Sequence, residues 1–336
     1  MSTIESQTIA VLGAGSWGTA LAMLLGHNNH QINLWSHNAA HASAMQKSRE
    51  NNRYLADLTF PKTLNVSSNL ESTFKNVTDI LIVVPSHAFR KTLETIKPFI
   101  TPAHRIAWAT KGLEANSCKL LHLVAREVLG DKIPLAVISG PTFAKEVAQG
   151  LPGAVTVASN DQTLALDWAH FLHNDHFRAY TSEDMIGVEI GGACKNVIAI
   201  AAGIADGMGF GANARAALIA RALAEITRLG ISLGAKAETF TGLTGLGDLV
   251  LTCTDNQSRN RRTGLALGEG EKLDDIVKQI GQVVEGVATA KEVVALARKQ
   301  KIDMPITEQV YNVLYENTAP KDAVNALFNR AITKEN

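Results

Sequence analysis

The sequence has no excess of charge of either sign. Lys plus Arg and Asp plus Glu are both 32, so the formal net charge at pH 7 is zero. Without an overall field, neither nucleic acid nor a membrane is an expected partner, and any anion must be bound by local geometry. Hydrophobic residues make up 46% and charged residues 19%, which predicts globular folding rather than disorder.

Cysteine is scarce, and Cys118, Cys194 and Cys253 are widely spaced. Three such residues fit neither a disulfide framework nor a zinc site, so a reducing compartment is the simpler explanation. The N-terminal segment has no basic stretch before its apolar run, and glycines break that run. We therefore expect a cytoplasmic protein with no metal, no signal peptide and no transmembrane span.

Internal repeats, low-complexity segments and a flexible linker are also missing, although 336 residues suit two domains. The first half alternates helical patterns with short apolar runs that contain almost no charge. Strands of this kind are covered on both faces, as in a parallel sheet flanked by helices. The expected strands are 8–12, 32–35, 80–84, 106–109 and 135–139, extended by 154–158 and 177–180, with helices that include 17–26 and 119–129.

From about Gly187 the pattern changes to helices with little strand signal. Many of these helices are rich in alanine and can pack closely. The expected helices are 188–204, 212–229, 274–280, 287–298 and 307–316. The sequence thus predicts an α/β protein: a doubly wound, Rossmann-like, mostly parallel sheet in an NAD(P)-binding domain at 1–188, and an all-helical substrate-binding and catalytic domain at 189–336. Substrate is expected in the crevice between domains.

The first motif with a chemical meaning is the glycine-rich turn of residues 13–18, Gly-Ala-Gly-Ser-Trp-Gly. It lies directly between a predicted strand and a predicted helix, which is the context that dinucleotide binding requires. Gly13 permits the tight turn, Gly15 lets the backbone approach a pyrophosphate, and Gly18 allows close packing of helix on strand. N–H groups near Ser16 and Trp17 face the anion at the helix N-terminus. A purely structural glycine turn is the alternative.

The end of the second strand bears on the choice of cofactor. NAD-selective sites place Asp or Glu there to accept from the ribose 2′-OH. Here the strand is followed by Ser36, His37 and Asn38, with no carboxylate, and Arg49 and Arg53 lie in the next segment. This pattern favours NADP(H), or at least tolerates it beside NAD(H). His37 could also be an ordinary loop histidine.

Two further loops follow predicted strands, where the sheet presents its C-terminal strand ends and ligands bind. Residues 85–87 are Pro-Ser-His, and Thr110, Lys111 and Gly112 follow the next strand. A lysine in that position is a better candidate for contact with a ligand than most lysines of this chain. The alternative is a solvated surface lysine.

Lys195 and Asn196 interrupt an otherwise apolar helical stretch. Lysine is costly to bury unless it has a partner or a task. Burial lowers a lysine pKa from its reference near 10.4, as a proton donor at neutral pH requires. Reduction of a ketone by hydride creates an alkoxide, which an ammonium can protonate while a neighbouring amide holds the oxygen. A lysine that snorkels at a helix edge is the alternative.

Asp248 stands alone in a glycine-rich apolar segment, residues 242–252, and needs a cationic or N–H partner there. Lys195 is one candidate, and the pairing would orient the ammonium. Asp248 could instead cap a helix. Three arginines, Arg259, Arg261 and Arg262, follow within four residues and form either a local anion site or a solvated helix face.

His170, His173 and His176 are spaced by three, which on one helix would align part of a metal-binding face. No fourth ligand stands at a recognisable spacing, and a strand is expected immediately afterwards. Solvated histidines before a loop are the favoured interpretation.

Taken together, these motifs resemble bacterial NAD(P)-dependent glycerol-3-phosphate dehydrogenase along nearly the whole chain. The matching stretches occur in family order and are GAGSWGTALA, VVPSHAFR, WATKGLE, ISGPTFAKE, GGACKNVIAIAAG, GFGANARAAL, GLGDLVLTCTDNQSRNRR, GQVVEG and MPITEQVY. The resemblance implies reversible hydride transfer between NAD(P)H and dihydroxyacetone phosphate, giving sn-glycerol 3-phosphate for glycerophospholipid synthesis. It also implies a homodimer.

The resemblance further implies roles for individual residues. Lys195 would be the catalytic acid and base, supported by Asp248 and Asn196. Substrate would be bound by Lys111, Gly140, Thr142, Lys195, Asp248, Thr252, Ser258, Arg259 and Asn260. Cofactor would be bound by the glycine-rich turn with Ser16 and Trp17, and by His37, Tyr54, Lys111, Ala144, Arg259, Val283 and Glu285. Ala144, Val283 and Glu285 rest on the resemblance alone. Cys194 we interpret as a small packed residue without a role of its own.

Two other functions are weighed against this one. A related β-hydroxyacid or sugar-acid dehydrogenase would share the fold and the lysine acid but would not need Arg259 for a phosphate. A catalytically silent NADPH-binding regulator would have no use for a buried acid, so Lys195, Asn196 and Asp248 argue against it.

Overall fold

The computed structural model describes residues 6–332 and residue 334. The first five residues of the N-terminal segment, where no signal peptide is expected, lie outside that range. The chain folds into two compact units. Unit 1 consists of residues 1–114 and 119–189, and unit 2 of residues 115–118 and 190–336.

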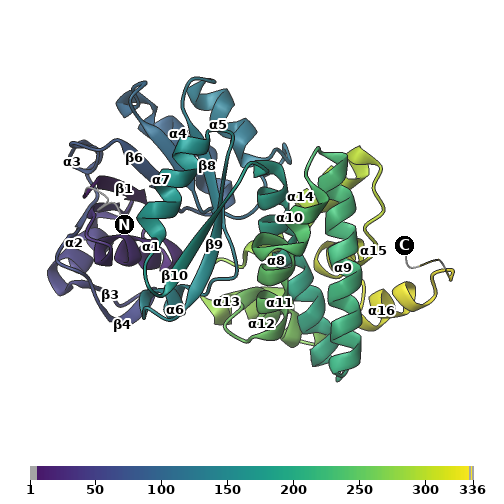
Figure 1. The fold of residues 1–336 in the computed structure, drawn as a ribbon. Helices are drawn as coiled ribbons and strands as arrows, with labels where there is room; N and C mark the ends of the chain where they lie inside the picture. Colours follow the sequence, from purple (N-terminus) through teal and green to yellow (C-terminus); the bar gives the residue numbers. More distant parts are fainter. Residues whose placement is uncertain (1–5, 333, 335–336) are drawn as a thin grey trace. The chain divides into compact units, whose positions relative to one another are not determined.

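Unit 1 is built on an eight-stranded sheet with the order β10-β9-β8-β7-β6-β1-β2-β5 (Figure 1). The strands are β1 (Thr8–Leu12), β2 (Gln31–Trp35), β5 (Leu64–Ser67), β6 (Asp79–Ile82), β7 (Arg105–Trp108), β8 (Leu135–Ser139), β9 (Gly153–Ser159) and β10 (Phe177–Ser182). All neighbouring strands pair in parallel except β8 and β9. The predicted mostly parallel sheet and its seven predicted strands are confirmed, whereas β5 was not predicted.

Alternating side chains of the strands pack on opposite faces of this sheet, which explains their continuous apolar runs. Ile9 and Val11 of β1 belong to one core, with α1 (Ser16–His27), α2 (Ala39–Ser48), α6 (Ala144–Ala148) and α7 (Gln162–Leu172). Ala10 and Leu12 belong to the other core, with α4 (Ser86–Ile96) and α5 (Leu121–Leu129). Two short helical segments, α3 (Leu70–Thr73) and η1 (Lys97–Phe99), and the hairpin β3 (Glu50–Asn51)–β4 (Leu55–Thr59) complete the unit.

The order of the strands places a topological switch point between β1 and β6. From β1 the chain runs outward through β2 and β5, and then crosses to β6 on the other side of β1. In doubly wound sheets, ligands bind beside such a point, outside the carboxyl ends of the strands. The glycine-rich turn follows β1 directly, so it lies at this location.

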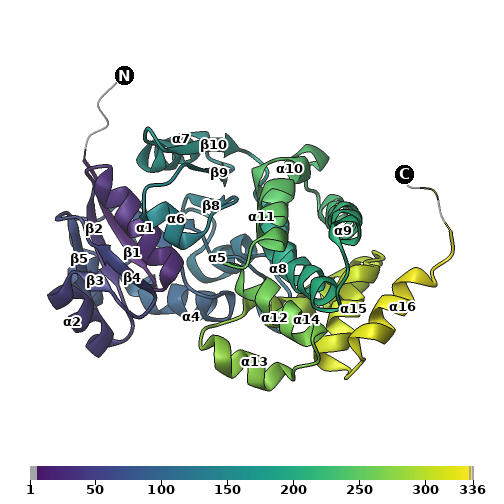
Figure 2. The same ribbon diagram turned by 90° about the horizontal axis from the view of Figure 1, so that it is seen from below.

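Unit 2 is helical, as predicted (Figure 2). Its helices are α9 (Ala212–Ser232), α10 (Ala237–Thr241), α11 (Asp248–Thr254), α12 (Arg259–Gly268), α13 (Leu273–Ile280), α14 (Glu285–Gln300), α15 (Pro305–Tyr315) and α16 (Pro320–Phe328). A π-helical turn, η2 (Leu243–Gly247), precedes α11. Helix α8 (Met185–Gly207) begins in unit 1 and continues into unit 2. The sequence predicted α8, α9 and α13–α15 but missed α10–α12 and α16.

Glycines bring the backbones of α8 and α12 into contact. A Cβ on Gly203 would lie 2.1 Å from the carbonyl oxygen of Arg261, and a Cβ on Gly264 would lie 2.0 Å from that of Ile200. Glycine is therefore required at both positions. Gly268 meets Ile204 in the same way, one turn further along both helices. The two helices thus run in a fixed register, with residue 200 beside 264 and residue 204 beside 268.

Among the described residues, one helix is long and apolar enough to cross a membrane. It is α8, and 94% of its apolar window is buried inside the protein. A mostly buried helix of this kind is typical of a protein core.

Candidate active site

The glycine-rich turn has the conformation that a dinucleotide requires. Gly13 has φ +117°, and a Cβ there would lie 2.3 Å from the carbonyl oxygen of Val83. A Cβ on Gly18 would lie 1.9 Å from the carbonyl oxygen of Gly13. A Cβ on Gly15 would meet no protein atom within 4 Å, so packing within the chain does not require glycine there. Gly15 is also the N-cap of α1, and because glycine has no side chain, no side-chain oxygen caps this helix. These features fit a pyrophosphate at the helix N-terminus.

Tyr54 and His37, which the resemblance assigned to the cofactor, lie in the connections that follow β3 and β2. Ser16 Oγ donates a hydrogen bond to the carbonyl oxygen of Tyr54 at 2.8 Å, which holds Tyr54 next to the turn. His37 is exposed between β2 and α2, whose N-terminus is capped by the Asn38 side chain. An exposed position in this loop agrees both with a cofactor contact and with an ordinary loop histidine.

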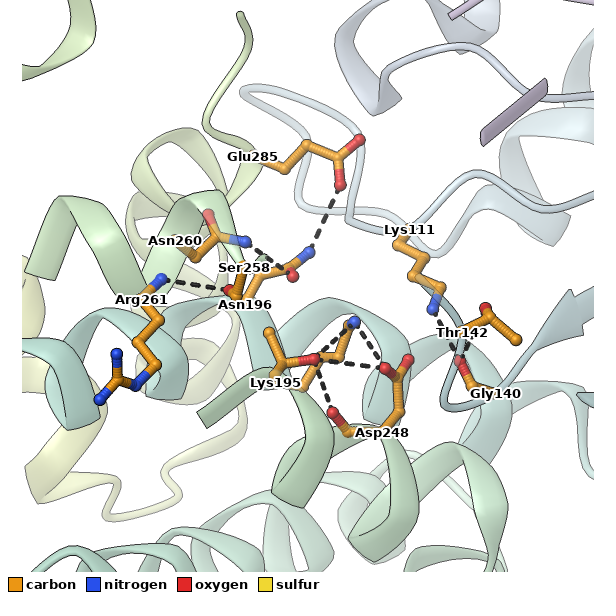
Figure 3. Close-up of polar contacts among 11 residues, drawn as sticks. Lys111, Gly140, Thr142, Lys195, Asn196, Asp248, Ser258, Asn260, Arg261 and Glu285 are labelled. Carbon is orange, nitrogen blue, oxygen red and sulfur yellow. Dashed lines mark hydrogen bonds and ion pairs between the residues drawn. The ribbon is translucent and has the colours of Figure 1, made fainter. Parts of the chain in front are cut away.

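Lys111 and Gly140 meet where two neighbouring strands end. Lys111 follows β7, Gly140 follows β8, and these strands pair in parallel. The Lys111 ammonium donates to the carbonyl oxygen of Gly140 at 3.2 Å, and the Thr142 hydroxyl donates to the same oxygen at 3.2 Å (Figure 3). Ala144 is the first residue of α6. Lys111 is therefore held at the carboxyl edge of the sheet rather than fully solvated.

In unit 2, Lys195 is a buried lysine whose ammonium is held by polar side chains. Its ammonium donates to Asp248 Oδ1 at 2.7 Å and to the Thr252 hydroxyl at 2.9 Å (Figure 3). Lys195 is only 7% exposed, and Asp248 is 1% exposed. Lys195 therefore does not snorkel to the surface. Asp248 is the first residue of α11, whose N-cap is Gly247, so its carboxylate serves as the partner of the lysine.

Two glycines near this pair permit close contacts between backbones. A Cβ on Gly191 would lie 2.5 Å from the carbonyl oxygen of Thr244, so glycine lets the π-helical turn lie directly on α8. A Cβ on Gly245 would lie 2.0 Å from the carbonyl oxygen of Phe240. Lys195 lies one turn after Gly191, and Asp248 lies four residues after Thr244, so the close contact of the backbones carries both side chains toward each other.

Beside the lysine, amide side chains form a continuous chain of hydrogen bonds (Figure 3). The backbone N–H of Gly286 donates to Asn260 Oδ1 at 2.9 Å, and Asn260 Nδ2 donates to Asn196 Oδ1 at 2.9 Å. Asn196 Nδ2 in turn donates to Glu285 Oε2 at 3.4 Å. Asn196 and Asn260 extend the register of α8 and α12 by one further turn. The chain fixes the orientation of both amides.

The structure separates the three arginines of residues 259–262. Arg261 is buried and serves the fold, because its guanidinium donates to the carbonyl oxygen of Cys253 at 3.0 Å and pairs with Asp206 at 2.5 Å. Arg262 is exposed. Arg259 is half-buried at the start of α12 and donates to Gln282 Oε1 at 3.1 Å. Arg259 is therefore the one of the three that is both positioned and accessible to an anion.

Ser258 and Val283 occupy the segments around Arg259. The Ser258 hydroxyl caps α12 by accepting from the backbone N–H of Arg261 at 3.2 Å. Val283 is 46% exposed in the connection between α13 and α14, next to Gln282. The positive end of the α12 helix dipole lies at this N-terminus and adds to the positive charge of Arg259.

Cys194, next to Lys195, is fully buried, and burial raises the pKa of its thiol to about 12. A thiol that stays protonated is neither a nucleophile nor a metal ligand, which supports a packing role.

The three histidines do not share a helix. His170 lies in α7, His173 follows its last residue, and His176 precedes β10. All three are exposed. Within residues 6–332 and 334, no group of three or more His, Cys, Asp or Glu side chains is placed to hold a metal ion.

Three residues that position the site were not singled out from the sequence. Gln282 holds Arg259, Gly286 donates to Asn260, and Asn51 donates to the carbonyl oxygen of Ala14 at 3.0 Å within the glycine-rich turn. Asn51 and Gln282 contact residues far away in the sequence, so no local pattern reveals them. For Gln282 and Gly286, the only signal in the sequence was the stretch GQVVEG, which contributes to the family resemblance.

A glycine-rich turn at the switch point of a doubly wound sheet, together with a buried lysine–aspartate pair on a helical unit, defines a class of protein. It is that of the nicotinamide-dependent dehydrogenases, in which the cofactor carries the hydride and the protein supplies an acid.

Comparisons with known proteins identify the family within this class. Residues 8–165 match the model of the NAD-dependent glycerol-3-phosphate dehydrogenase N-terminus, and residues 184–325 match that of its C-terminus. Glycerol-3-phosphate dehydrogenase [NAD(P)+] of Pseudoalteromonas translucida is 56% identical over 98% of both chains. The protein of the same name from Haemophilus influenzae is 56% identical over 99% of this chain and 100% of its own. The crystal structure of glycerol-3-phosphate dehydrogenase from Coxiella burnetii has 51% identity and a TM-score of 0.94, covering 97% of this chain and 99% of that one.

The chain therefore belongs to the NAD-dependent glycerol-3-phosphate dehydrogenase family. It is an oxidoreductase, and its cofactor is NAD(H) or NADP(H).

Proposed function

We propose that this chain catalyses reversible hydride transfer between NAD(P)H and dihydroxyacetone phosphate, giving sn-glycerol 3-phosphate. The observation that carries the proposal is the buried Lys195 ammonium held by Asp248 and Thr252, in a chain of this family. Family membership favours this reaction over that of a β-hydroxyacid dehydrogenase. The intact acid favours an enzyme over a silent regulator.

We assign the first unit, at about 1–188, to the cofactor and the helical unit, at about 189–336, to catalysis. Gly13, Gly15, Ser16, Trp17 and Gly18 would hold the pyrophosphate, and His37, Tyr54, Lys111, Ala144, Arg259, Val283 and Glu285 would contact other parts of the dinucleotide. When bound, NAD(P)H supplies the hydride that the ketone receives. The protein contributes positioning and a proton.

Lys195 supplies that proton. As the C2 carbonyl of dihydroxyacetone phosphate is reduced, negative charge develops on its oxygen, and the Lys195 ammonium donates a proton to it. Ketone, hydride and proton together give the alcohol. In the reverse direction the neutral Lys195 amine accepts the hydroxyl proton. The Asp248 carboxylate offsets the cost of burying the ammonium, and Thr252 fixes the direction of the ammonium. Asn196, held by Asn260 and Glu285, would support the substrate oxygen.

The substrate phosphate is assigned to the N-terminus of α12. Arg259 provides a guanidinium fork, and Ser258 and Asn260 stand on either side of it in the sequence. Asn260 Nδ2 donates one of its two hydrogens to Asn196, and we assign the other hydrogen to the phosphate. Lys111, Gly140 and Thr142 are assigned to the substrate from unit 1.

The direct test of this function follows absorbance at 340 nm with NADPH and each candidate substrate. We expect rapid loss of NADPH with dihydroxyacetone phosphate and little with 3-keto acids or unphosphorylated dihydroxyacetone. Rapid loss with a 3-keto acid alone would indicate the β-hydroxyacid reaction. NADPH binding without turnover on any substrate would indicate a regulator.

The assembly and location of the protein belong to the same proposal. We infer a homodimer in the cytoplasm, whose product feeds glycerophospholipid synthesis. The homodimer and the link to lipid synthesis rest on the resemblance to the family, whereas the three free cysteines agree with a reducing compartment. Light scattering of the purified protein would show a mass twice that of the chain.

A further inference from the structure

The short loop of residues 52–54, between β3 and β4, is fastened to the glycine-rich turn at both ends. Asn51 is fully buried, and its Nδ2 donates to the carbonyl oxygen of Ala14 at 3.0 Å and to the Thr19 hydroxyl at 2.7 Å. At the other end of the loop, Ser16 Oγ donates to the carbonyl oxygen of Tyr54 at 2.8 Å. The position of this loop is therefore set by the same residues that form the proposed dinucleotide site.

The Tyr54 ring, which belongs to this loop, packs between α2 on one side and Arg53 on the other. It packs edge-on against the ring of His41 in α2, with 5.5 Å between the ring centroids. His41 Nε2 also lies 3.1 Å from Asn51 Oδ1. The Arg53 guanidinium lies over the Tyr54 ring, 5.1 Å from its centroid. Helix α2 begins just after β2, and the end of the second strand is where this fold places the adenosine ribose.

This segment contains two arginines, Arg49 and Arg53. The Arg49 guanidinium is engaged by Phe60 and Pro61. Its Nη2 donates to the carbonyl oxygen of Pro61 at 2.8 Å, and its guanidinium lies over the Phe60 ring, 5.8 Å from the centroid. Arg53 is exposed. Stacking on Tyr54 uses the flat face of its guanidinium and leaves the N–H groups at the edge to meet a phosphate in a forked geometry.

We propose that Arg53 binds the 2′-phosphate of NADP(H) and is the residue that separates NADP(H) from NAD(H) in this chain. Tyr54, His41 and Asn51 are positioning residues that hold the guanidinium beside the glycine-rich turn. The inference rests on the proposed dinucleotide site but not on the identity of the substrate.

The test uses fragments of the cofactor, so that binding is measured apart from catalysis. Calorimetric titrations of the full-length protein with 2′,5′-ADP and with 5′-AMP isolate the contribution of the 2′-phosphate. We expect Arg53→Gln to weaken binding of 2′,5′-ADP by about tenfold to fiftyfold, as for a partly exposed charge-assisted contact, and to leave 5′-AMP binding unchanged. The ratio of kcat/KM for NADPH to that for NADH should fall by a similar factor.

Arg49→Gln is the matched control, because it removes an equal charge four residues away and should leave both affinities unchanged. Unchanged 2′,5′-ADP binding in Arg53→Gln would overturn the proposal, as would an equal loss for 5′-AMP, which would indicate a disturbed loop. A selective loss in His37→Gln but not in Arg53→Gln would assign the phosphate to His37. If the fragments bind as expected but dihydroxyacetone phosphate is not reduced, the proposed function fails while this inference stands.

Discussion

Replacing Lys195 with alanine should lower kcat for dihydroxyacetone phosphate by about 10²–10⁴, the usual contribution of a positioned general acid. Affinity for NADPH should change little, because the proposed pyrophosphate site lies in unit 1 and Lys195 is not among the residues assigned to the cofactor. Lys278→Ala is the control, since Lys278 is a solvated lysine of the helical unit whose side chain is 78% exposed. It should retain full activity. Steady-state kinetics and a fluorescence titration with NADPH measure both quantities on the same sample.

The Lys195 variant also needs a check of folding, because it leaves the Asp248 carboxylate buried without its cation. Breaking a buried ion pair in this way costs about 3–5 kcal/mol of stability. Asp248→Asn removes the opposite charge and keeps the Lys195 amine, and it places a neutral amide in the buried position. This variant should also slow catalysis, because the lysine loses its charged partner. A folded Lys195→Ala protein that binds NADPH and turns over at nearly the normal rate would remove Lys195 from the mechanism.

Replacing Arg259 with alanine should lower kcat/KM for dihydroxyacetone phosphate by about 10²–10³. The guanidinium would form a forked pair with the phosphate, and each charge-assisted hydrogen bond contributes about 1.5–3 kcal/mol. The loss should largely vanish with unphosphorylated dihydroxyacetone, which is expected to be a poor substrate from the start. Because Arg259 is also assigned to the cofactor, the informative quantity is the ratio of kcat/KM for the two substrates. A cofactor effect alone would lower both values equally.

The neighbouring arginine supplies the matched control for this experiment. Arg262 carries the same charge on the same helix but is exposed. Arg262→Ala should leave the substrate ratio unchanged. Arg261 is unsuitable because it is buried against Asp206 and its loss would disturb the fold. An unchanged ratio in Arg259→Ala would move the phosphate elsewhere, most directly to Lys111, and would reopen the keto-acid alternative.

The sheet of unit 1 could be predicted because its strands carry their own signal. Runs such as Ile9–Leu12 are apolar at every position, since consecutive side chains enter two different cores. The strand β5 (Leu64–Ser67) was missed because it has four residues and only two buried side chains. The glycine-rich turn was recognisable because its glycines serve local geometry within one strand and one helix.

Helix α12 shows why part of the helical unit could not be predicted. Its sequence, RNRRTGLALG, contains two glycines that lower helix propensity. Those glycines allow the backbone of α8 to pack directly against α12, and the sequence alone does not reveal this contact. The pairing of Lys195 with Asp248 joins residues 53 positions apart, and the sequence could only suggest it. Nor could the sequence show which of the three arginines is buried and which is accessible.

The family resemblance added residues to the candidate site that local sequence patterns do not indicate. Val283 lies exposed beside Gln282, which holds Arg259, and Glu285 accepts from Asn196. Their assignment to the cofactor remains a prediction, as do the other residue roles. The contacts are compatible with the assignment, because Glu285 bonds Asn196, the neighbour of Lys195 in the sequence, and Val283 follows Gln282, which bonds Arg259.

The reaction proposed for this chain is tested by following the hydride itself. The purified protein is incubated with dihydroxyacetone phosphate and NADPH carrying deuterium at both C4 positions, and the product is analysed by mass spectrometry and NMR. We expect sn-glycerol 3-phosphate with one deuterium bound to C2, and a hydroxyl proton that exchanges with water. A product without deuterium at C2, or no glycerol 3-phosphate while the cofactor is consumed, would contradict the proposed reaction.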